Sequence, residues 1–319
     1  LMSNILSFFE TALFLRDNDD YLILTHDNPD GDTLGSAFAL CFALRKMGKR
    51  ANVIAEEIAE KYAFIADGYA DCDFTPKTIV AVDIASESMF GEKTKEYVNK
   101  VDLCIDHHES NTKYAKNLYL DATSAANCEN VYNVIKELNV DFDKQIATCL
   151  YTGIATDTGC FKFSNVTSNT HICAANLFTF GVDHAKINFS LFEQKSKERM
   201  SAEKLVIETL EYFADGKIAV CAITDEIVEK TGVLQSDFDA MVAIPRCILG
   251  VEIGITLKQR GNGFKISLRS SENFNVSEIC KVYNGGGHAR AAGCFIEGDL
   301  AEVKDKIVNT CIEAVCGKC

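Results

Sequence analysis

Two of the six histidines of the chain are adjacent, and both follow an aspartate at the end of a mostly apolar run. Residues 101–105 read VDLCI and lead directly into Asp106, His107 and His108. Imidazole and carboxylate groups are common metal ligands. The stretch therefore predicts a buried strand that ends in side chains able to bind a metal.

Two further apolar runs end in the same kinds of side chain. The groups that follow these runs are His26, Asp30 and Asp32 after residues 21–25 (YLILT), and Asp83 after residues 78–82 (TIVAV). The carboxyl ends of parallel strands lie at one edge of a sheet, where ligands bind. We therefore expect all these side chains to meet at that edge, together with Asp157 at the end of a helix predicted over residues 144–156.

Each of these stretches also has a purely structural explanation. The sequence HDNPDGD is typical of a turn, in which Asp30 and Asp32 are turn residues and Asp32 or Thr33 caps the following helix. A single histidine after a strand is more often structural than a ligand, and Asp83 alone could cap a helix. Because several independent runs deliver His or Asp to the same edge, a metal site is the favoured interpretation.

The types of these side chains indicate which metals would suit the site. Two imidazoles with several carboxylates and no thiolate suit Mn²⁺, Mg²⁺ or Fe²⁺ better than structural zinc. The carboxylates are too many for one small cation. Two cations roughly 3.5–4 Å apart that share a bridging carboxylate would account for them and would form a clamp for phosphoryl hydrolysis.

Alternating strands and helices are predicted around these residues. Buried strands are expected at residues 21–25, 51–55, 78–82 and 101–105. A helix is predicted between the first two strands, where Leu34, Phe38, Cys41 and Leu44 recur at helical spacing before Gly48. Helices are also predicted over 127–138 and 144–156. This alternation indicates an α/β fold with a parallel sheet.

The length of 319 residues predicts two domains. We expect a first domain over residues 1–190, a polar connection over 191–204 and a second, smaller α/β domain over 205–319. Strands of the second domain are predicted at 217–224, 251–259, 264–270 and 294–298, and helices near 236–244, 276–283 and 300–315.

The amino terminus and the composition favour a cytoplasmic protein. Residues 5–20 predict an amphipathic helix with Ile5, Leu6, Phe9 and Leu13 turned inward, and the lack of a basic start and the acidic end argue against a signal peptide. No apolar run approaches the ~18 residues of a membrane span. The 14 cysteines are mostly single residues in apolar runs, as expected of reduced core thiols, and the pair Cys316 and Cys319 is a weak zinc signal in an expected frayed tail.

The net charge of −14 argues against general binding of long nucleic acids, which depends on many contacts from Lys and Arg to phosphates. A small phosphorylated ligand held at one local site is compatible with this charge.

Taken in order along the chain, these motifs resemble those of the DHH phosphoesterase superfamily. The matching stretches are HDNPDGD, Asp83 after TIVAV, DHH at 106–108 and GIATDTGCFKF, and NGGGHARAAG (284–293) resembles the glycine-rich signature of the DHHA1 domain. The resemblance covers residues 21 to 297. It implies a DHH domain followed by a DHHA1 domain, with the active site in a cleft between them.

The resemblance also implies roles for individual residues. One metal would be held by His26, Asp30 and Asp83, and the other by Asp32, His107 and Asp157, with Asp83 bridging. Asp106 would orient a histidine and make it a better ligand, and His108 would face the substrate phosphate. A hydroxide that bridges two Mn²⁺ ions would attack phosphorus in line with the leaving oxygen.

In the second domain, the resemblance assigns Arg269, Gly286, Gly287 and His288 to substrate binding. The glycines would present backbone N–H groups to an anion at a helix start. Arg246 could also reach the substrate, although a surface arginine after a proline turn is the structural alternative.

Among members of the superfamily, the compact form with this second domain resembles the nanoRNase class. That class degrades very short RNA and linear dinucleotides and dephosphorylates 3′-phosphoadenosine 5′-phosphate. The alternative within the enzymes is an exopolyphosphatase or a cyclic-dinucleotide phosphodiesterase. A nucleotide-binding regulatory protein with a degenerate site is disfavoured because every expected ligand is present. A homodimer is possible by analogy.

Overall fold

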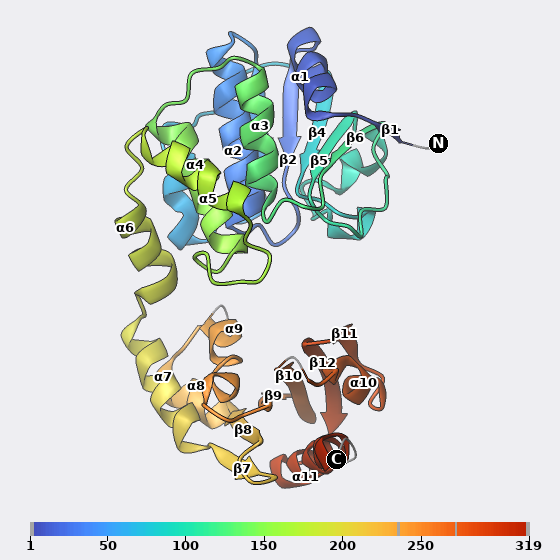
Figure 1. Cartoon of the computed structure of the whole chain (residues 1–319), viewed down its shortest axis with the longest axis vertical. Helices are drawn as coiled ribbons and strands as arrows, with labels where there is room; N and C mark the ends of the chain where they lie inside the picture. Colours follow the sequence, from blue (N-terminus) through green and yellow to red (C-terminus); the bar gives the residue numbers. More distant parts are fainter. Residues whose placement is uncertain (1–2, 235–236, 272, 317–319) are drawn as a thin grey trace. The chain divides into compact units, whose positions relative to one another are not determined.

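The computed structural model describes residues 3–234, 237–271 and 273–316, and the chain divides into two compact units, residues 1–194 and 195–319 (Figure 1). The segment predicted as a connection, 191–204, contains the start of helix α7 (Lys197–Glu208). Its charged sequence has a structural reason, because Lys195 and Arg199 both pair with Glu203, at 2.6 and 2.9 Å.

The first unit is built on a parallel sheet with the strand order β1-β6-β5-β4-β2-β3. Its strands are β1 (Asn4–Ile5), β2 (Tyr21–Leu24), β3 (Ala51–Ile54), β4 (Thr78–Val82), β5 (Leu103–Asp106) and β6 (Asn117–Leu120). Alternate residues of β2 pack into two different cores, Tyr21 and Ile23 on one face and Leu22 and Leu24 on the other. The predicted parallel sheet is thus confirmed, and its burial on both faces explains the continuous apolar runs.

Helices pack against one face of this sheet (Figure 1). The helices of the first unit are α1 (Phe8–Asp17), α2 (Gly31–Lys46), α3 (Asn127–Glu137), α4 (Lys144–Asp157), α5 (Ser168–Phe178) and α6 (His184–Asn188). The three helices predicted here, α2, α3 and α4, are confirmed. Helices α2 and α4 approach closely at Gly35, where an added Cβ would lie 2.4 Å from the carbonyl oxygen of Cys149.

The amino-terminal helix has a different inner face from the predicted one. Ile5 lies in strand β1 and is 55% exposed, and Phe9 is 49% exposed. Ser7 caps α1 in a capping box with Glu10, so the helix begins at Phe8 and turns Ala12 and Leu15 into the core. The predicted inward positions were wrong for Ile5 and Phe9 because the helical register was started too early.

The second unit contains a mixed sheet in the order β11-β12-β10-β9-β8-β7. Its strands are β7 (Glu211–Phe213), β8 (Ile218–Ile223), β9 (Ile253–Arg260), β10 (Gly263–Ser270), β11 (Gly286–His288) and β12 (Ala291–Glu297). Its helices after α7 are α8 (Asp225–Thr231), α9 (Phe238–Met241), α10 (Val276–Lys281) and α11 (Leu300–Cys316). The predicted second α/β domain is confirmed.

The sequence predicted a helix start at the glycine-rich stretch, and this prediction was wrong. Gly286 to His288 form strand β11, which pairs antiparallel with β12 after helix α10 has ended. The stretch instead forms one arm of a hairpin at the edge of the sheet.

Single cysteines lie in the cores, as predicted: the buried free thiols include Cys41, Cys104, Cys149, Cys221 and Cys294. Of the carboxyl-terminal pair, Cys319 lies outside the described residues, so the structure does not test that zinc signal. None of the helices in the described part of the chain has the length and apolarity needed to cross a membrane.

Candidate metal centre

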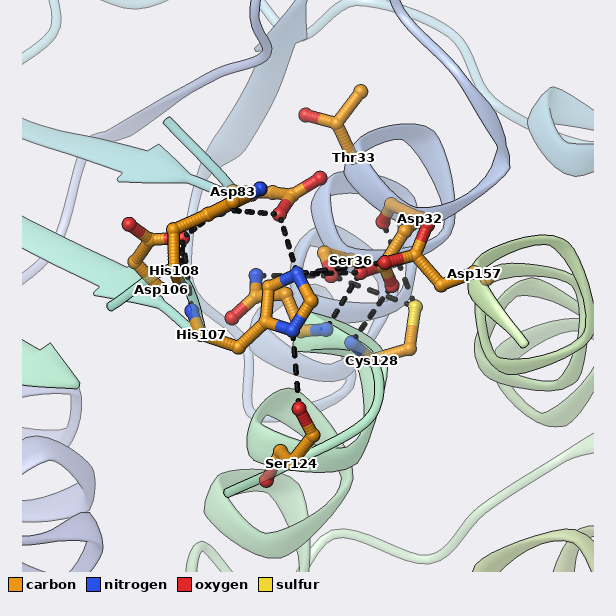
Figure 2. Close-up of polar contacts among 12 residues, drawn as sticks. Asp32, Thr33, Ser36, Asp83, Asp106, His107, His108, Ser124, Cys128 and Asp157 are labelled. Carbon is orange, nitrogen blue, oxygen red and sulfur yellow. Dashed lines mark hydrogen bonds and ion pairs between the residues drawn. The ribbon is translucent and has the colours of Figure 1, made fainter. Parts of the chain in front are cut away.

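The strand ends bring predicted ligands to one edge of the first sheet, and Figure 2 shows Asp83, His107 and Asp157 close together there. His26 follows β2, Asp83 comes directly after β4, and Asp106 is the last residue of β5. Asp83 has a left-handed backbone with φ of 59°, which is uncommon for a residue other than glycine. Such strained backbone is found most often at functional sites.

Asp83 lies between two groups of potential ligands. Its Oδ2 is 3.9 Å from His26 Nε2, and its Oδ1 is 3.5 Å from His107 Nε2. Asp30 Oδ1 is 3.8 Å from the same nitrogen of His26. His26, Asp30 and Asp83 offer ligand atoms that all lie within 4.8 Å of one another. The two oxygens of Asp83 therefore face two different histidines.

The second group is centred on His107. Its Nε2 lies 3.4 Å from Asp157 Oδ2 and 3.9 Å from Asp32 Oδ2, in addition to its approach to Asp83. The ligand atoms of Asp32, His107 and Asp157 also lie within 4.8 Å of one another. These two groups contain every side chain that was predicted from the sequence to be a metal ligand, and each group could hold a metal ion.

The electrostatics of this cluster favour cations. Asp83 Oδ1 and His107 Nε2 are buried without a hydrogen-bond partner among the described residues, which is costly for polar atoms. Burial, with the neighbouring carboxylates, raises the pKa of Asp32 to about 7 and that of Asp157 to about 8. The same causes raise the pKa of Asp83 well above its usual value. Bound divalent cations would satisfy the orphaned atoms and neutralise the crowded carboxylates.

Two helix amino termini fix the acidic ligands. Both carboxylate oxygens of Asp32 accept backbone N–H groups at the start of α3, from Asn127 at 2.5 Å and from Cys128 at 2.8 Å. Asp30 caps α2 by accepting the N–H groups of Asp32 and Thr33 at 2.9 and 3.1 Å. The helix cap considered in the sequence analysis is thus Asp30, and not Asp32 or Thr33. A carboxylate keeps lone pairs for a metal while it accepts such bonds.

The adjacent histidines have different surroundings. His107 Nδ1 is 3.1 Å from the carbonyl oxygen of Ser124, which leaves Nε2 facing the carboxylates (Figure 2). His108 Nδ1 is 2.8 Å from Asp106 Oδ1, and Asn111 donates to Asp106 Oδ2 at 2.6 Å. The histidine that Asp106 orients is therefore His108, whereas the expectation from the family pattern placed Asp106 behind a metal ligand.

These bonds adjust both members of the Asp106–His108 pair. Hydrogen bonds from His108 and Asn111 lower the pKa of Asp106, although its burial opposes them. The hydrogen bond to Asp106 raises the pKa of His108. The side chain of His108 is 37% exposed against 12% for His107, so His108 is the histidine that solvent or a ligand can reach.

Several residues that shape the site were not identified from the sequence. Ser124 acts through its main-chain carbonyl, which leaves no signal in a side-chain pattern. Gly153 lets α4 approach α2, because an added Cβ would lie 2.7 Å from Asp32 Oδ1 and 2.2 Å from Cys128 Sγ. A glycine inside a predicted helix was the available signal for such a close approach.

Comparison with known proteins identifies the family. Residues 20–154 match the model of the DHH family, N-terminal domain, and residues 215–316 match that of the DHHA1 domain. The protein named bifunctional oligoribonuclease and PAP phosphatase NrnA from Thermus thermophilus is 31% identical over 294 residues, which cover 90% of this chain and 87% of that protein. The chain belongs to the DHH–DHHA1 family.

Other comparisons agree with this DHH–DHHA1 assignment. The protein named probable bifunctional oligoribonuclease and PAP phosphatase NrnA from Streptococcus mutans is 28% identical and covers 93% of this chain and 96% of its own length. A crystal structure of an exopolyphosphatase-related protein from Bacteroides fragilis superimposes with a TM-score of 0.84 at 22% identity, covering 95% of each chain. At 22% identity, the similarity to the B. fragilis structure shows only a shared fold.

The DHHA1 domain brings its predicted substrate residues together on one part of its sheet. Ala291 of β12 pairs with Arg269 of β10 on one side and with His288 of β11 on the other. Directly paired residues project from the same face of a sheet, so the side chains of Arg269 and His288 flank Ala291. Arg246 is exposed in a 3₁₀-helix (Pro245–Cys247). The main chain of Arg246 lies against Gly254 of β9, and Gly254 pairs with Arg269.

The two glycines of β11 differ in what they require. Gly287 has φ of 140°, and an added Cβ would lie 2.6 Å from the carbonyl oxygen of Ala291. Gly286 is exposed and has open space where a Cβ would be. Gly287 is therefore needed by the hairpin itself, whereas the fold leaves Gly286 free to approach a ligand.

Proposed function

We propose that the protein is a dimetal phosphoesterase that hydrolyses short oligonucleotides, linear dinucleotides and 3′-phosphoadenosine 5′-phosphate. The observation that carries this proposal is the position of Asp83 between two histidine–carboxylate groups. The names of the T. thermophilus and S. mutans relatives support the choice of substrates.

In this proposal His26, Asp30 and Asp83 would hold one cation, Asp32, His107 and Asp157 would hold the other, and Asp83 would contribute to both. Mn²⁺ is the first choice, with Mg²⁺ and Fe²⁺ as alternatives, because imidazole and carboxylate ligands suit all three. Two such cations supply Lewis-acid stabilisation of a phosphoryl group and a water of lowered pKa. The carboxylates of Asp30, Asp32, Asp83 and Asp157 would balance the charge of two divalent cations, so that an anionic substrate is not repelled.

His108 is the residue we assign to the substrate phosphate. Its partial exposure leaves it accessible, and its bond to Asp106 favours the protonated imidazole. A protonated imidazole donates a charge-assisted hydrogen bond to a phosphate oxygen. Asp106, which Asn111 holds in turn, is the residue that positions His108.

The DHHA1 domain is assigned to substrate binding through Arg269, Arg246, Gly286, Gly287 and His288. A guanidinium beside an imidazole suits a phosphate group, and the open position at Gly286 allows close approach to its main chain. A single phosphate-binding site of this kind, on a protein with a net charge of −14, suits substrates with few phosphates, because long nucleic acids need many contacts from Lys and Arg.

The test is Mn²⁺-dependent hydrolysis of a 5′-labelled RNA dinucleotide, a labelled 24-mer and 3′-phosphoadenosine 5′-phosphate. We expect rapid turnover of the dinucleotide and the bisphosphate, slow turnover of the 24-mer, and none in EDTA. Asp83→Asn should lose at least a hundredfold in kcat/KM, because it removes the shared charge while asparagine tolerates the left-handed backbone. Asp73→Asn makes the same change at an exposed position and should retain full activity.

Failure on all three substrates with cations bound would overturn the proposal. Turnover of polyphosphate or of cyclic dinucleotides in the same assay would then favour the alternative activities within the superfamily.

A further inference from the structure

The loop that follows Asp157 has an unusual backbone. Gly159, Cys160 and Phe161 are consecutive residues with φ of 55°, 59° and 63°. Two of them are not glycine, and side chains in this left-handed region are strained. Backbone of this kind is kept when surrounding contacts fix it, and it concentrates at ligand sites.

The contacts that fix this loop are present. Asn165 donates to the carbonyl oxygen of Asp157 at 3.1 Å and to that of Ala125 at 3.0 Å. Ala125 is the neighbour of Ser124, whose carbonyl oxygen contacts His107. The loop is therefore tied to the two chain segments that hold His107 and Asp157 in the metal centre.

The strained turn sends its two phenylalanines to different places. The ring of Phe161 packs inward, stacked on His171 at 5.4 Å between centroids and tilted against Tyr151 at 6.1 Å. The side chain of Phe163 remains 57% exposed. Its backbone N–H is fixed by a 3.0 Å bond to the carbonyl oxygen of Thr158.

One side of the Phe163 ring is covered by main chain and the rest faces solvent. An added Cβ on Gly159 would lie 2.4 Å from atoms of the ring, so Phe163 packs directly against the backbone of Gly159. Figure 1 shows the α4–α5 loop at the end of the first unit toward which strand β2 points, the end at which the metal centre lies. Phe163 is thus an exposed aromatic ring packed on Gly159, and its backbone is hydrogen-bonded to Thr158, the residue that follows Asp157 of the metal centre.

We propose that Phe163 is the stacking surface for one nucleobase of the oligonucleotide substrate. This inference rests on the proposed function. An aromatic ring stacks on any base, because every base has a π-face, so the contact gives affinity without reading sequence. Packing of the ring on Gly159 before the substrate arrives reduces the entropy lost on binding. Phe163 would place a base beside the metal centre and so position the adjoining phosphodiester.

The test uses 5′-phosphorylated dinucleotides with a non-hydrolysable methylenephosphonate linkage, with Mn²⁺ present and 2-aminopurine at one position or the other. Stacking on an aromatic ring quenches 2-aminopurine fluorescence. We expect the wild-type protein to quench one of the two probes strongly. Phe163→Trp should preserve the quenching, and Phe163→Leu, which keeps apolar packing on Gly159 without a π-face, should abolish it.

Hydrolysis gives an independent readout. Stacking contributes roughly 1–3 kcal/mol per base, so Phe163→Leu should lower kcat/KM on pApA about 5- to 150-fold. The same variant should match the wild type on a dinucleotide that is abasic at the stacked position. Phe9→Ala, which removes another exposed phenylalanine, should change neither readout.

Equal quenching by wild type and Phe163→Leu would overturn the inference. So would a fall in kcat/KM of Phe163→Leu that is as large on the abasic substrate as on pApA. The second result would mean that Phe163 only supports the loop. Failure of the wild-type protein to hydrolyse pApA would contradict the dinucleotide activity in the proposed function, whereas the fluorescence of the non-hydrolysable probes would still decide whether Phe163 stacks on a base.

Discussion

At the scale of single residues, the site is dominated by carboxylates that repel one another. Asp32, Asp83 and Asp157 are brought together around His107, and each has a raised pKa. Such a cluster is unfavourable while its members are ionised and unpaired, and it becomes favourable when cations bind. Metal binding and folding stability should therefore be linked.

This linkage predicts how the stability of the metal-free protein depends on pH. An unfolded aspartate has a pKa of about 3.9, whereas Asp32 and Asp157 have folded-state values of about 7 and about 8. The folded protein then binds more protons than the unfolded chain above pH ~4, so stability falls as pH rises through the folded pKa values. In EDTA, the free energy of unfolding should decrease from pH 5 to pH 8, and the stabilisation by Mn²⁺ should grow over the same range.

Urea unfolding at several pH values, with EDTA or with Mn²⁺, measures both quantities. Asp157→Asn should flatten the pH dependence in EDTA, and the exposed change Asp73→Asn should leave it as in the wild type. An Mn²⁺ effect of the same size at pH 5 and pH 8 would contradict the linkage.

The sequence predicts the residues of this cluster better than their contacts. Histidines and aspartates at strand ends can be recognised because strand runs and ligand types are local features. The pairing of Asp106 with His108 depends on side-chain directions after the strand has ended. The contact of His107 with Ser124 depends on a main-chain carbonyl from a distant loop, which no residue pattern records.

At the scale of elements, the close packing of α2 against α4 sets the position of Asp32. Gly153→Ala would place a methyl group 2.2 Å from Cys128 Sγ and 2.7 Å from Asp32 Oδ1. Overpacking of this kind destabilises proteins by about 1–3 kcal/mol. We expect a loss of stability of that order in urea unfolding, together with weaker Mn²⁺ binding by calorimetry.

A second change separates the two effects of this substitution. Removing the sulfur in Cys128→Ala makes room on one side, so stability should recover in part in the Gly153→Ala, Cys128→Ala double variant. The contact with Asp32 remains, so metal affinity should stay low. If Gly153→Ala kept wild-type stability and wild-type Mn²⁺ affinity, the neighbouring helices would have to move apart at little cost to accept the added methyl group, which would contradict this prediction.

The elements themselves divide into those that the sequence could predict and those that it could not. Strands β2 to β5 are short apolar runs because the sheet is buried on both faces. Strand β1 has only two residues, both exposed, and it exists because it pairs with β6. The Ser7–Glu10 capping box was a readable signal for the start of α1, but hydrophobic spacing alone gave the wrong register.

At the scale of the whole molecule, the candidate metal ligands all lie in the first unit, and the proposed substrate residues of the DHHA1 domain lie in the second. Each unit has its own hydrophobic cores. Two binding tasks carried by separately packed units should be separable by mutation.

Arg269→Ala tests this separation. A hydrogen bond to a charged group contributes about 1.5–3 kcal/mol, so losing the guanidinium should weaken substrate binding roughly 10- to 150-fold. We expect this loss in KM for the dinucleotide, with the stoichiometry and affinity of Mn²⁺ unchanged in calorimetry. Asp83→Asn should show the opposite pattern, with impaired metal binding.

Lys265→Ala is the matched control for Arg269→Ala, because Lys265 lies four residues earlier on the same strand and is exposed. It removes an equal charge from the same unit, so an equal rise in KM would indicate a general charge effect and not a phosphate contact at Arg269. A loss of Mn²⁺ affinity in Arg269→Ala would show instead that the two units do not act separately. The expected pair of results would show that metal binding in the first unit is independent of the phosphate contact made by Arg269 in the second.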